Sequence, residues 1–297
     1  MLRPFQEFST PRHILQDNQF DTSEQEILQE QEPIIPEIKI DHHIKTDSDV
    51  LIVIPQALDL VAQSLMAIGG KQVKHLSTIS VRFPELDTQK RKQEKGSTDE
   101  EFDDEEQLYK SSASYYLAKQ DEKAIKLYQI ENGQGAKINF LTIPIFKSKL
   151  IYNLLSNTIF GGYNIKQLVT LGTGELNSNE TINVLASSSE VLKKAITKAG
   201  LISQIPTFKP PHFITGPIGS IVSGSVFQGV DNLTFVAAAE GAFHLDLERV
   251  NNDSFIDLGT VLADYLKLDG GDHKFVKIVE QKLKYKKAGS ADSSLYL

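Results

Sequence analysis

The segment Asp49-Val50-Leu51-Ile52-Val53-Ile54-Pro55 decides the fold class of this 297-residue chain. Five consecutive apolar residues, most of them β-branched, lie between Asp49 and Pro55, which is typical of a buried strand. Residues 56–68 follow with apolar side chains at helical spacing, and Gly69-Gly70 end that pattern, as glycine commonly does after a helix. A buried strand followed at once by an amphipathic helix indicates an α/β protein.

Strand and helix patterns alternate through the rest of the chain. Strand patterns occupy residues 73–83, 113–118, 124–130, 137–143, 165–171 and 233–239. Helical spacing occupies residues 149–160, 190–198, 216–226, 255–268, and 274 to 283 or slightly beyond. Asn132-Gly133 suits a hairpin turn between two of the strands. This order predicts a three-layer α/β/α sandwich with a mixed sheet.

Two polar stretches interrupt the pattern. Residues 1–48 are rich in Gln, Glu, Asp and Pro, and we interpret them as a partly disordered leader. Residues 85–110 carry a basic half and then an acidic half, which indicates a disordered, solvated insertion. A nuclear-import patch or a kinase site in this insertion is a weaker interpretation than a plain surface loop. The expected organisation is a single α/β domain over 49–284 and a flexible tail over 285–297.

Composition excludes several classes of function. The chain has no cysteine, so disulfides, thiolate nucleophiles, Cys-type zinc sites and thiol-ligated iron–sulfur clusters are all excluded. The formal net charge is −8, from 31 basic and 39 acidic residues, which argues against nucleic acid as a partner. The first residues lack a signal-peptide pattern, and no apolar run is long enough to span a bilayer. We therefore expect no membrane association and a location in the cytoplasm or the nucleus.

The sequence nominates no catalytic residues, no cofactor site and no metal site. Gly172-Thr173-Gly174 lacks the remainder of a phosphate-binding motif, and we interpret it as a turn at the end of a strand. Gly216 and Gly219 begin a helix, where they would let the helix pack closely on the sheet. The seven histidines have no ligand-like spacing, and no Gly-x-Ser-x-Gly elbow is present. The expectation is a protein that is not an enzyme.

The C-terminus has a distinct composition. Lysines end the last helix, residues 288–294 form a spacer of small and polar residues, and Leu295-Tyr296-Leu297 follow. A flexible tether that carries an aromatic anchor and a terminal carboxylate suits docking into a pocket of another protein. The alternative is that these three residues end the chain by chance or pack back onto the domain.

This ending resembles the hydrophobic–Tyr–X tails with which proteasome activators and assembly chaperones enter pockets between α-subunits of the 20S core particle. Residues 210–220, Pro-Pro-His-Phe-Ile-Thr-Gly-Pro-Ile-Gly-Ser, resemble the corresponding stretch of fungal proteasome assembly chaperone 1. Residues 168–173, Leu-Val-Thr-Leu-Gly-Thr, resemble the preceding strand of that family. The resemblance runs from about residue 140 to the end and is faint over 1–140.

The resemblance implies a non-catalytic chaperone that pairs with a second, related chaperone as a heterodimer. That heterodimer would bind the outer face of the α-ring, promote α-ring assembly and block premature binding of activators. Leu295, Tyr296 and the carboxylate of Leu297 would then enter an α-subunit pocket. The chain could also be the second member of the pair, but the Ile-Thr-Gly-x-Ile-Gly-Ser stretch favours the first. The family fold is reminiscent of nucleoside phosphorylases, so a small-molecule enzyme of that type is the alternative function, although shared fold carries no activity with it.

Overall fold

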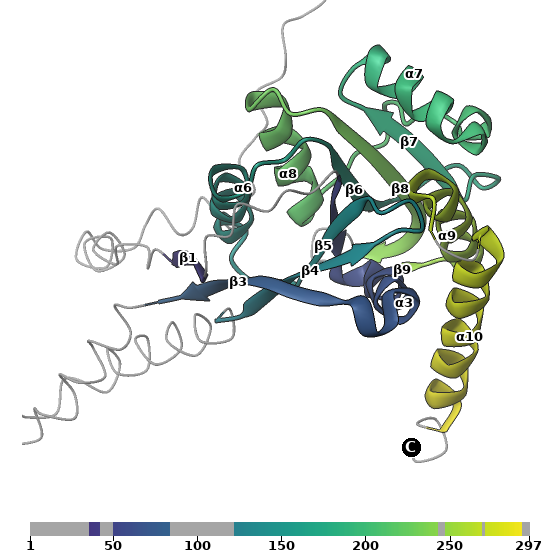
Figure 1. Cartoon of the computed structure of the whole chain (residues 1–297), viewed down its shortest axis with the longest axis horizontal. Coiled ribbons are helices and arrows are strands. Elements are labelled where there is room, and N and C mark those ends of the chain that lie inside the picture. The colour runs from purple at the N-terminus through teal and green to yellow at the C-terminus, as the bar shows by residue number, and fades with distance from the viewer. Residues whose placement is uncertain (1–35, 42–49, 84–121, 243–246, 269–270, 293–297) are drawn as a thin grey trace, which may run out of the picture. The chain divides into compact units, whose positions relative to one another are not determined.

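The computed structural model describes a nine-stranded sheet with helices on both faces (Figure 1). The described residues are 36–41, 50–83, 122–242, 247–268 and 271–292. This architecture confirms the α/β fold class and the mixed sheet that the sequence predicts.

The strand order is β1-β3-β4-β5-β2-β6-β8-β7, and β9 pairs with β8. Strands β5, β2, β6 and β8 are mutually parallel, whereas every other pairing is antiparallel. In chain order the strands are β1 (Glu37–Asp41), β2 (Val50–Pro55), β3 (Lys74–Arg82), β4 (Ala124–Glu131), β5 (Lys137–Ile143), β6 (Leu168–Gly174), β7 (Ile182–Ala186), β8 (Asn232–Ala242) and β9 (Leu247–Val250).

Strand β2 lies inside the sheet between β5 and β6, and all six of its residues are buried. Ile52 and Ile54 point into the larger hydrophobic core, and the alternate residues Leu51 and Val53 point to the other face. A strand covered on both faces by helices needs an unbroken apolar run rather than an alternating pattern. This requirement explains why residues 50–54 carry no polar side chain.

Helices form a layer on each face of the sheet. The larger core is shared by α3 (Asp59–Gly69), α7 (Ser189–Lys198), α9 (Asn252–Leu266) and α10 (Gly271–Asp292). The opposite face is covered by α6 (Leu150–Gly162) and α8 (Gly216–Phe227), which pack against each other and against the sheet. Short 3-10 turns are η1 (Gln56–Leu58), η2 (Gly70–Gln72) and η3 (Gly200–Gln204). The three predicted layers are therefore present.

The Gly172–Gly174 segment differs from its prediction as a turn, because it forms the end of the fully buried strand β6. Gly174 pairs with Ala238 of β8, and a Cβ on Gly174 would lie 3.1 Å from the Val236 side chain. Glycine at this position indicates that the neighbouring strand β8 approaches closely, and not that the backbone turns. Periodicity also missed β7 and β9, which are short.

Strand β1 lies within the predicted polar leader and is a second difference. Its Ile38 and Ile40 are half-buried while Glu37, Lys39 and Asp41 are exposed. This alternation suits an edge strand, and Ile40 approaches Gly162 of α6. The predicted strand 113–118, the predicted insertion 85–110 and the rest of the predicted leader lie outside the described residues.

The contact between α6 and α8 generates a stability prediction. A Cβ on Gly224 of α8 would lie 2.3 Å from Ser156 Oγ and 2.9 Å from the Phe160 ring of α6, whereas a Cβ on Gly161 would meet nothing within 4 Å. Gly224→Ala should destabilise the fold by about 1 kcal/mol or more because it overpacks the helix contact. The matched variant Gly161→Ala should be neutral or stabilising by up to about 1 kcal/mol, since alanine favours helix. Urea unfolding measures both changes, and equal stabilisation by the two alanines would contradict the close helix contact.

Candidate functional site

Helix α10 carries the predicted docking tail away from the domain. Its first half packs on α3 and α9 through the buried side chains Phe275, Val279 and Leu283. Gly259 of α9 lies in this contact, where a Cβ would be 3.5 Å from both Phe275 and Val279, an ordinary packing distance. The far end of α10 extends away from the sheet (Figure 1). The helix is therefore anchored at its start, and its described backbone extends outward as far as residue 292 (Figure 1).

The last helix is longer than the sequence pattern predicts. Its backbone stays helical to Asp292, so most of the residues expected to form a flexible spacer belong to α10. Lysine and alanine, which fill much of residues 282–288, are good helix formers, and a single glycine at 289 costs only about 1 kcal/mol. Leu295, Tyr296 and Leu297 lie outside the described residues, so their docking stays a prediction.

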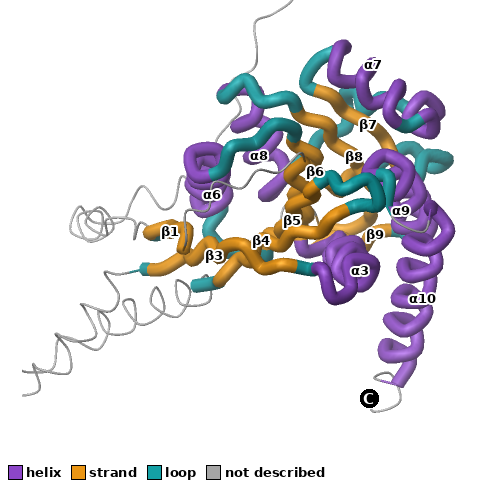
Figure 2. The backbone as a smooth tube through the Cα atoms, in the orientation of Figure 1, coloured by secondary structure: helices purple, strands orange, loops and turns teal. Residues whose placement is uncertain are grey.

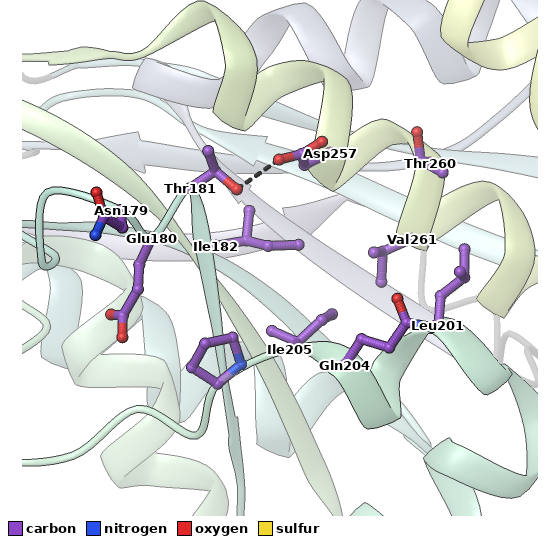
Figure 3. Close-up of a pocket in the computed structure, with 11 residues that line it drawn as sticks. Asn179, Glu180, Thr181, Ile182, Leu201, Gln204, Ile205, Asp257, Thr260 and Val261 are labelled. Atoms are coloured by element: carbon purple, nitrogen blue, oxygen red, sulfur yellow. Dashed lines mark hydrogen bonds between the residues drawn. The ribbon is translucent and has the colours of Figure 1, made fainter.

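A cavity of about 390 Å³ lies between the start of β7, η3 and α9, and Figure 3 shows its lining. Thr181 Oγ1 donates a hydrogen bond to Asp257 Oδ2 at 2.5 Å. The Glu180 side chain points away from Asp257 (Figure 3). Hydrogen bonds from Asn183 and Asn177 hold the pKa of Glu180 below its ordinary value, so Glu180 is ionised at neutral pH. Glu180 and Asp257 do not face each other across this cavity (Figure 3).

A second cavity, of about 330 Å³, lies at the amino end of β6 and contains Lys166, Lys194, Lys198 and Asp231. Lys198 Nζ lies 4.2 Å from the centre of the Tyr265 ring, and Tyr265 accepts a hydrogen bond from Gln167. Burial raises the pKa of Tyr265 to about 12. Tyr265 of α9 thus contacts Lys198 of α7 and Gln167, which lies just before β6.

Neither a metal-binding cluster nor a membrane-spanning helix occurs in the described part of the chain. Within residues 36–41, 50–83, 122–242, 247–268 and 271–292, no group of three or more His, Cys, Asp or Glu side chains could hold a metal ion. His75 hydrogen-bonds Thr78 at 3.0 Å, and the His212 ring centre lies 5.9 Å from that of Phe208. Over the same residues, no helix is both long enough and apolar enough to cross a bilayer.

Residues 210–220, which carry the family resemblance, form the loop into α8 and its first turn. Gly216 has a φ of +63°, which favours glycine, and Pro217 occupies the first turn of the helix. A Cβ on Gly219 would lie 2.8 Å from the Ile214 carbonyl oxygen. Glycine at 219 therefore lets the backbone of the loop before α8 approach the first turn of the helix. The predicted role for Gly219 in packing on the sheet is wrong. Gly172 of β6 lies directly beneath Ile214 and Ile218, so the structure brings the two resembling segments together.

Helices α6 and α8 form an uncharged pair. Ser220 Oγ donates to Asn153 Oδ1 at 2.9 Å, Ser156 Oγ donates to the Ser220 carbonyl at 3.2 Å, and Gly224 lies against Phe160. These contacts advance in the same direction along both helices, so the helices run parallel. Figure 2 shows the two helices side by side. Neither helix contains Asp, Glu, Lys or Arg.

The outward surface of this pair collects the exposed apolar side chains. Among the described residues, the exposed large hydrophobic side chains are Leu150 (45%), Phe213 (68%), Val226 (64%) and Phe227 (89%). Leu150 begins α6, Phe213 precedes α8, and Val226 and Phe227 end α8. We call this surface, made of α6, α8 and the loop 206–215, the α6–α8 face. Exposed apolar residues that share one uncharged pair of helices indicate a candidate binding surface.

This face has a signal in the sequence that periodicity and motifs do not capture. Residues 150–165 and 210–230 contain no Asp, Glu, Lys or Arg, although both stretches include a helix. A helix with one solvated side normally carries charge there, so two uncharged helices could have indicated a covered surface.

The sequence profile described as POC1 chaperone matches residues 1–297. No curated protein sequence matches this chain. The profile therefore covers the leader and the insertion as well as the described domain.

Two solved archaeal structures are similar to this chain in fold. PbaB of Pyrococcus furiosus, described as an archaeal proteasome activator, has a TM-score of 0.54 at 9% identity and covers 86% of this chain and 99% of its own. PbaA of Pyrococcus furiosus, described as an archaeal homolog of proteasome-assembly chaperone, has a TM-score of 0.52 at 12% identity and covers 82% of this chain and 92% of its own. At these low sequence identities, the structural similarity to PbaB and PbaA shows that this chain shares their fold.

The raised pKa of Tyr265 generates a pH prediction. Above pH 10 an unfolded tyrosine loses its proton, whereas folded Tyr265 keeps its proton up to about pH 12. The unfolded state then binds fewer protons than the folded state, so the free energy of unfolding should fall as the pH rises from about 10 to 12. Tyr265→Phe should remove this part of the decline. Urea unfolding at several alkaline pH values measures how the free energy of unfolding depends on pH. Identical pH slopes for the variant and the wild type would exclude deprotonation of Tyr265 as the cause of the decline.

Proposed function

Because this chain belongs to the POC1 chaperone family, we propose that it acts in assembly of the 20S proteasome as a non-catalytic, protein-binding subunit. The observation that carries the proposal is the family match over all 297 residues. The fold shared with PbaB and PbaA supports it, since those proteins are described as a proteasome activator and a proteasome-assembly chaperone homolog. The proposed location is the cytoplasm, with the nucleus as a further compartment.

The proposal extends to a heterodimer with a second, related chaperone on the outer face of the α-ring. There the pair would promote correct association of α-subunits and block activators until the core particle is complete. A single short tail is a weak ligand, but two tails on one dimer would gain from the effective concentration that the first contact creates. This gain is the physical reason for pairing two chaperones that each bind weakly.

In this proposal Leu295, Tyr296 and the Leu297 carboxylate enter a pocket between α-subunits. Tyrosine supplies a large apolar surface with a polar tip, which suits a pocket that is apolar inside and wet at its mouth. A lysine of the pocket would pair with the carboxylate in a charge-assisted hydrogen bond. The helical backbone of α10 to Asp292 supports this role, because a helix anchored on α3 and α9 holds the tail in a fixed direction.

Removal of Leu295–Leu297 should weaken binding to immature 20S particles by roughly 10- to 100-fold, since a charge-assisted bond contributes about 1.5–3 kcal/mol. The domain should stay folded, because the deleted residues lie beyond the buried part of α10. Titration of purified α-rings with labelled chaperone measures the change. Tyr296→Phe is the matched control and should bind far better than Tyr296→Ala.

A further variant separates the carboxylate from the side chains. One glycine added after Leu297 keeps Leu295 and Tyr296 but moves the terminal charge, so it should also weaken binding. Full binding by the truncated chain would exclude the tail mechanism. Stoichiometric binding of inorganic phosphate or inosine to the purified protein in calorimetry would instead favour the phosphorylase-like alternative.

A further inference from the structure

The two helix layers of this domain differ in their outward chemistry. Helices that face water usually carry charged residues on their outer side. Each helix of the larger layer follows this rule: α3 carries Asp59, α7 carries Lys193 and Lys194, and α9 and α10 carry several charges. Helices α6 and α8 carry none, and they hold the exposed apolar side chains. The outward surface of α6 and α8 therefore has the composition of a covered surface rather than a solvated one.

We propose that the α6–α8 face binds a second subunit of the same α/β fold, whose own helix pair is uncharged at its centre and acidic at its rim. The inference rests on the proposed function, because it assigns the surface through which the two chaperones of the pair meet. It also separates that surface from the tail, which α10 carries on the opposite side of the sheet (Figure 1).

The size of the face suits a folded partner. Helices α6 and α8 have 13 and 12 residues. At 1.5 Å per residue each is about 18–20 Å long, and two packed helices are together about 20 Å wide. A partner that covers this area and its surrounding rim approaches the roughly 800 Å² per side of a standard interface. Another helix pair of the same dimensions matches this flat surface along its whole length.

The apolar side chains are placed as anchors for such a contact. Phe227 is 89% exposed at one end of the pair, and Phe213 is 68% exposed at the other. An aromatic side chain buries about 150–250 Å² when it is covered, so these two supply much of the apolar area. Between them Ser223 is exposed and Gly219 and Ser220 are half-buried, which leaves a shallow strip where another helix can approach closely.

Charge at the rim selects the kind of subunit. The segments that lead into the two helices, residues 144–149 and 206–215, contain Lys147, Lys149 and Lys209 and no carboxylate. All three lysines are exposed. A second copy offers these lysines no carboxylate from the same segments, and wherever the two lysine-bearing ends met, like charges would disfavour the pairing. Carboxylates on the partner's rim would instead attract these lysines, so the observations favour a related subunit over a second copy.

The test is the double variant Val226→Asp with Phe227→Asp in the full chain. Both side chains are largely exposed, so the circular dichroism spectrum and thermal midpoint of the isolated protein should stay close to wild type. Sedimentation velocity should show wild-type protein as a monomer when alone and as a one-to-one complex with the second assembly chaperone of the same species. The variant should bind that chaperone at least about 100-fold more weakly, as expected when apolar interface anchors become charged.

Two controls sharpen the experiment. Thr197→Asp with Gln281→Asp adds the same two charges to exposed positions of the opposite helix layer and should leave the complex intact. Lys149→Glu with Lys209→Glu reverses the rim and should also weaken the complex, most strongly at low salt.

The outcomes distinguish failure of the α6–α8 assignment from failure of the proposed chaperone function. An intact complex in the Val226/Phe227 variant overturns the α6–α8 assignment and leaves the chaperone function standing. A dimer of the chain alone that this variant dissociates means that a second copy is the occupant. Deletion of residues 1–35 tests whether the chain's own leader covers the face. If the deletion increases binding of an apolar dye to the wild-type face, and the same deletion has no such effect in the Val226/Phe227 variant, the leader is the occupant. If the wild-type protein binds neither the second chaperone nor α-rings, that result contradicts the proposed function and also the inference that rests on it.

Discussion

The burial of β2 on both faces and along both edges is the constraint on which the remaining structure depends. Its backbone bonds to β5 and β6, and its side chains enter the hydrophobic layers on both sides of the sheet. A strand in that position forces helices onto each face, because exposed Ile52 or Val53 would leave apolar surface in water. The first helix after β2, α3, covers one face, and α6 and α8 cover the other. The three layers are thus a consequence of one unbroken apolar segment.

That layering also separates the surfaces proposed for binding. α10 packs on α3 and α9, so the tail leaves from the layer of the larger core. The exposed apolar residues gather on the other layer, around α8. A sheet whose strand order runs through eight strands, with β9 paired to the end of β8, lies between the two layers. One subunit can therefore contact a ring surface through its tail and a second subunit through its helix pair, with neither contact blocking the other.

The sequence predicted the elements whose signal is local and missed those set by distant partners. The apolar run at 50–54 and the helical spacing of α6, α7 and α9 needed no tertiary information. The glycines of β6 looked like a turn, and only their pairing with β8 makes Gly172 and Gly174 strand residues. The residues of β1 were assigned to the polar leader. Their two isoleucines identify a strand only once β1 is paired with β3 and Ile40 is seen to contact α6. For the candidate surfaces, the tail was readable as a motif, but the α6–α8 face required knowing that Leu150 and Phe227 belong to adjacent helices.

The carboxyl ends of the parallel strands carry polar groups whose contacts the structure shows. In parallel sheets, ligands usually bind at the carboxyl ends of the strands, where loops supply polar groups. In this chain Gln56 Oε1 after β2 accepts from the Ile145 N–H at 2.9 Å, and Thr173 Oγ1 of β6 donates to Glu248 Oε1 at 3.1 Å. The other Glu248 oxygen, Oε2, is buried and has no hydrogen-bond partner in the described part of the chain. The two bonds join the segment after β2 to the segment after β5, and β6 to β9, so they stabilise the loops at this edge of the sheet.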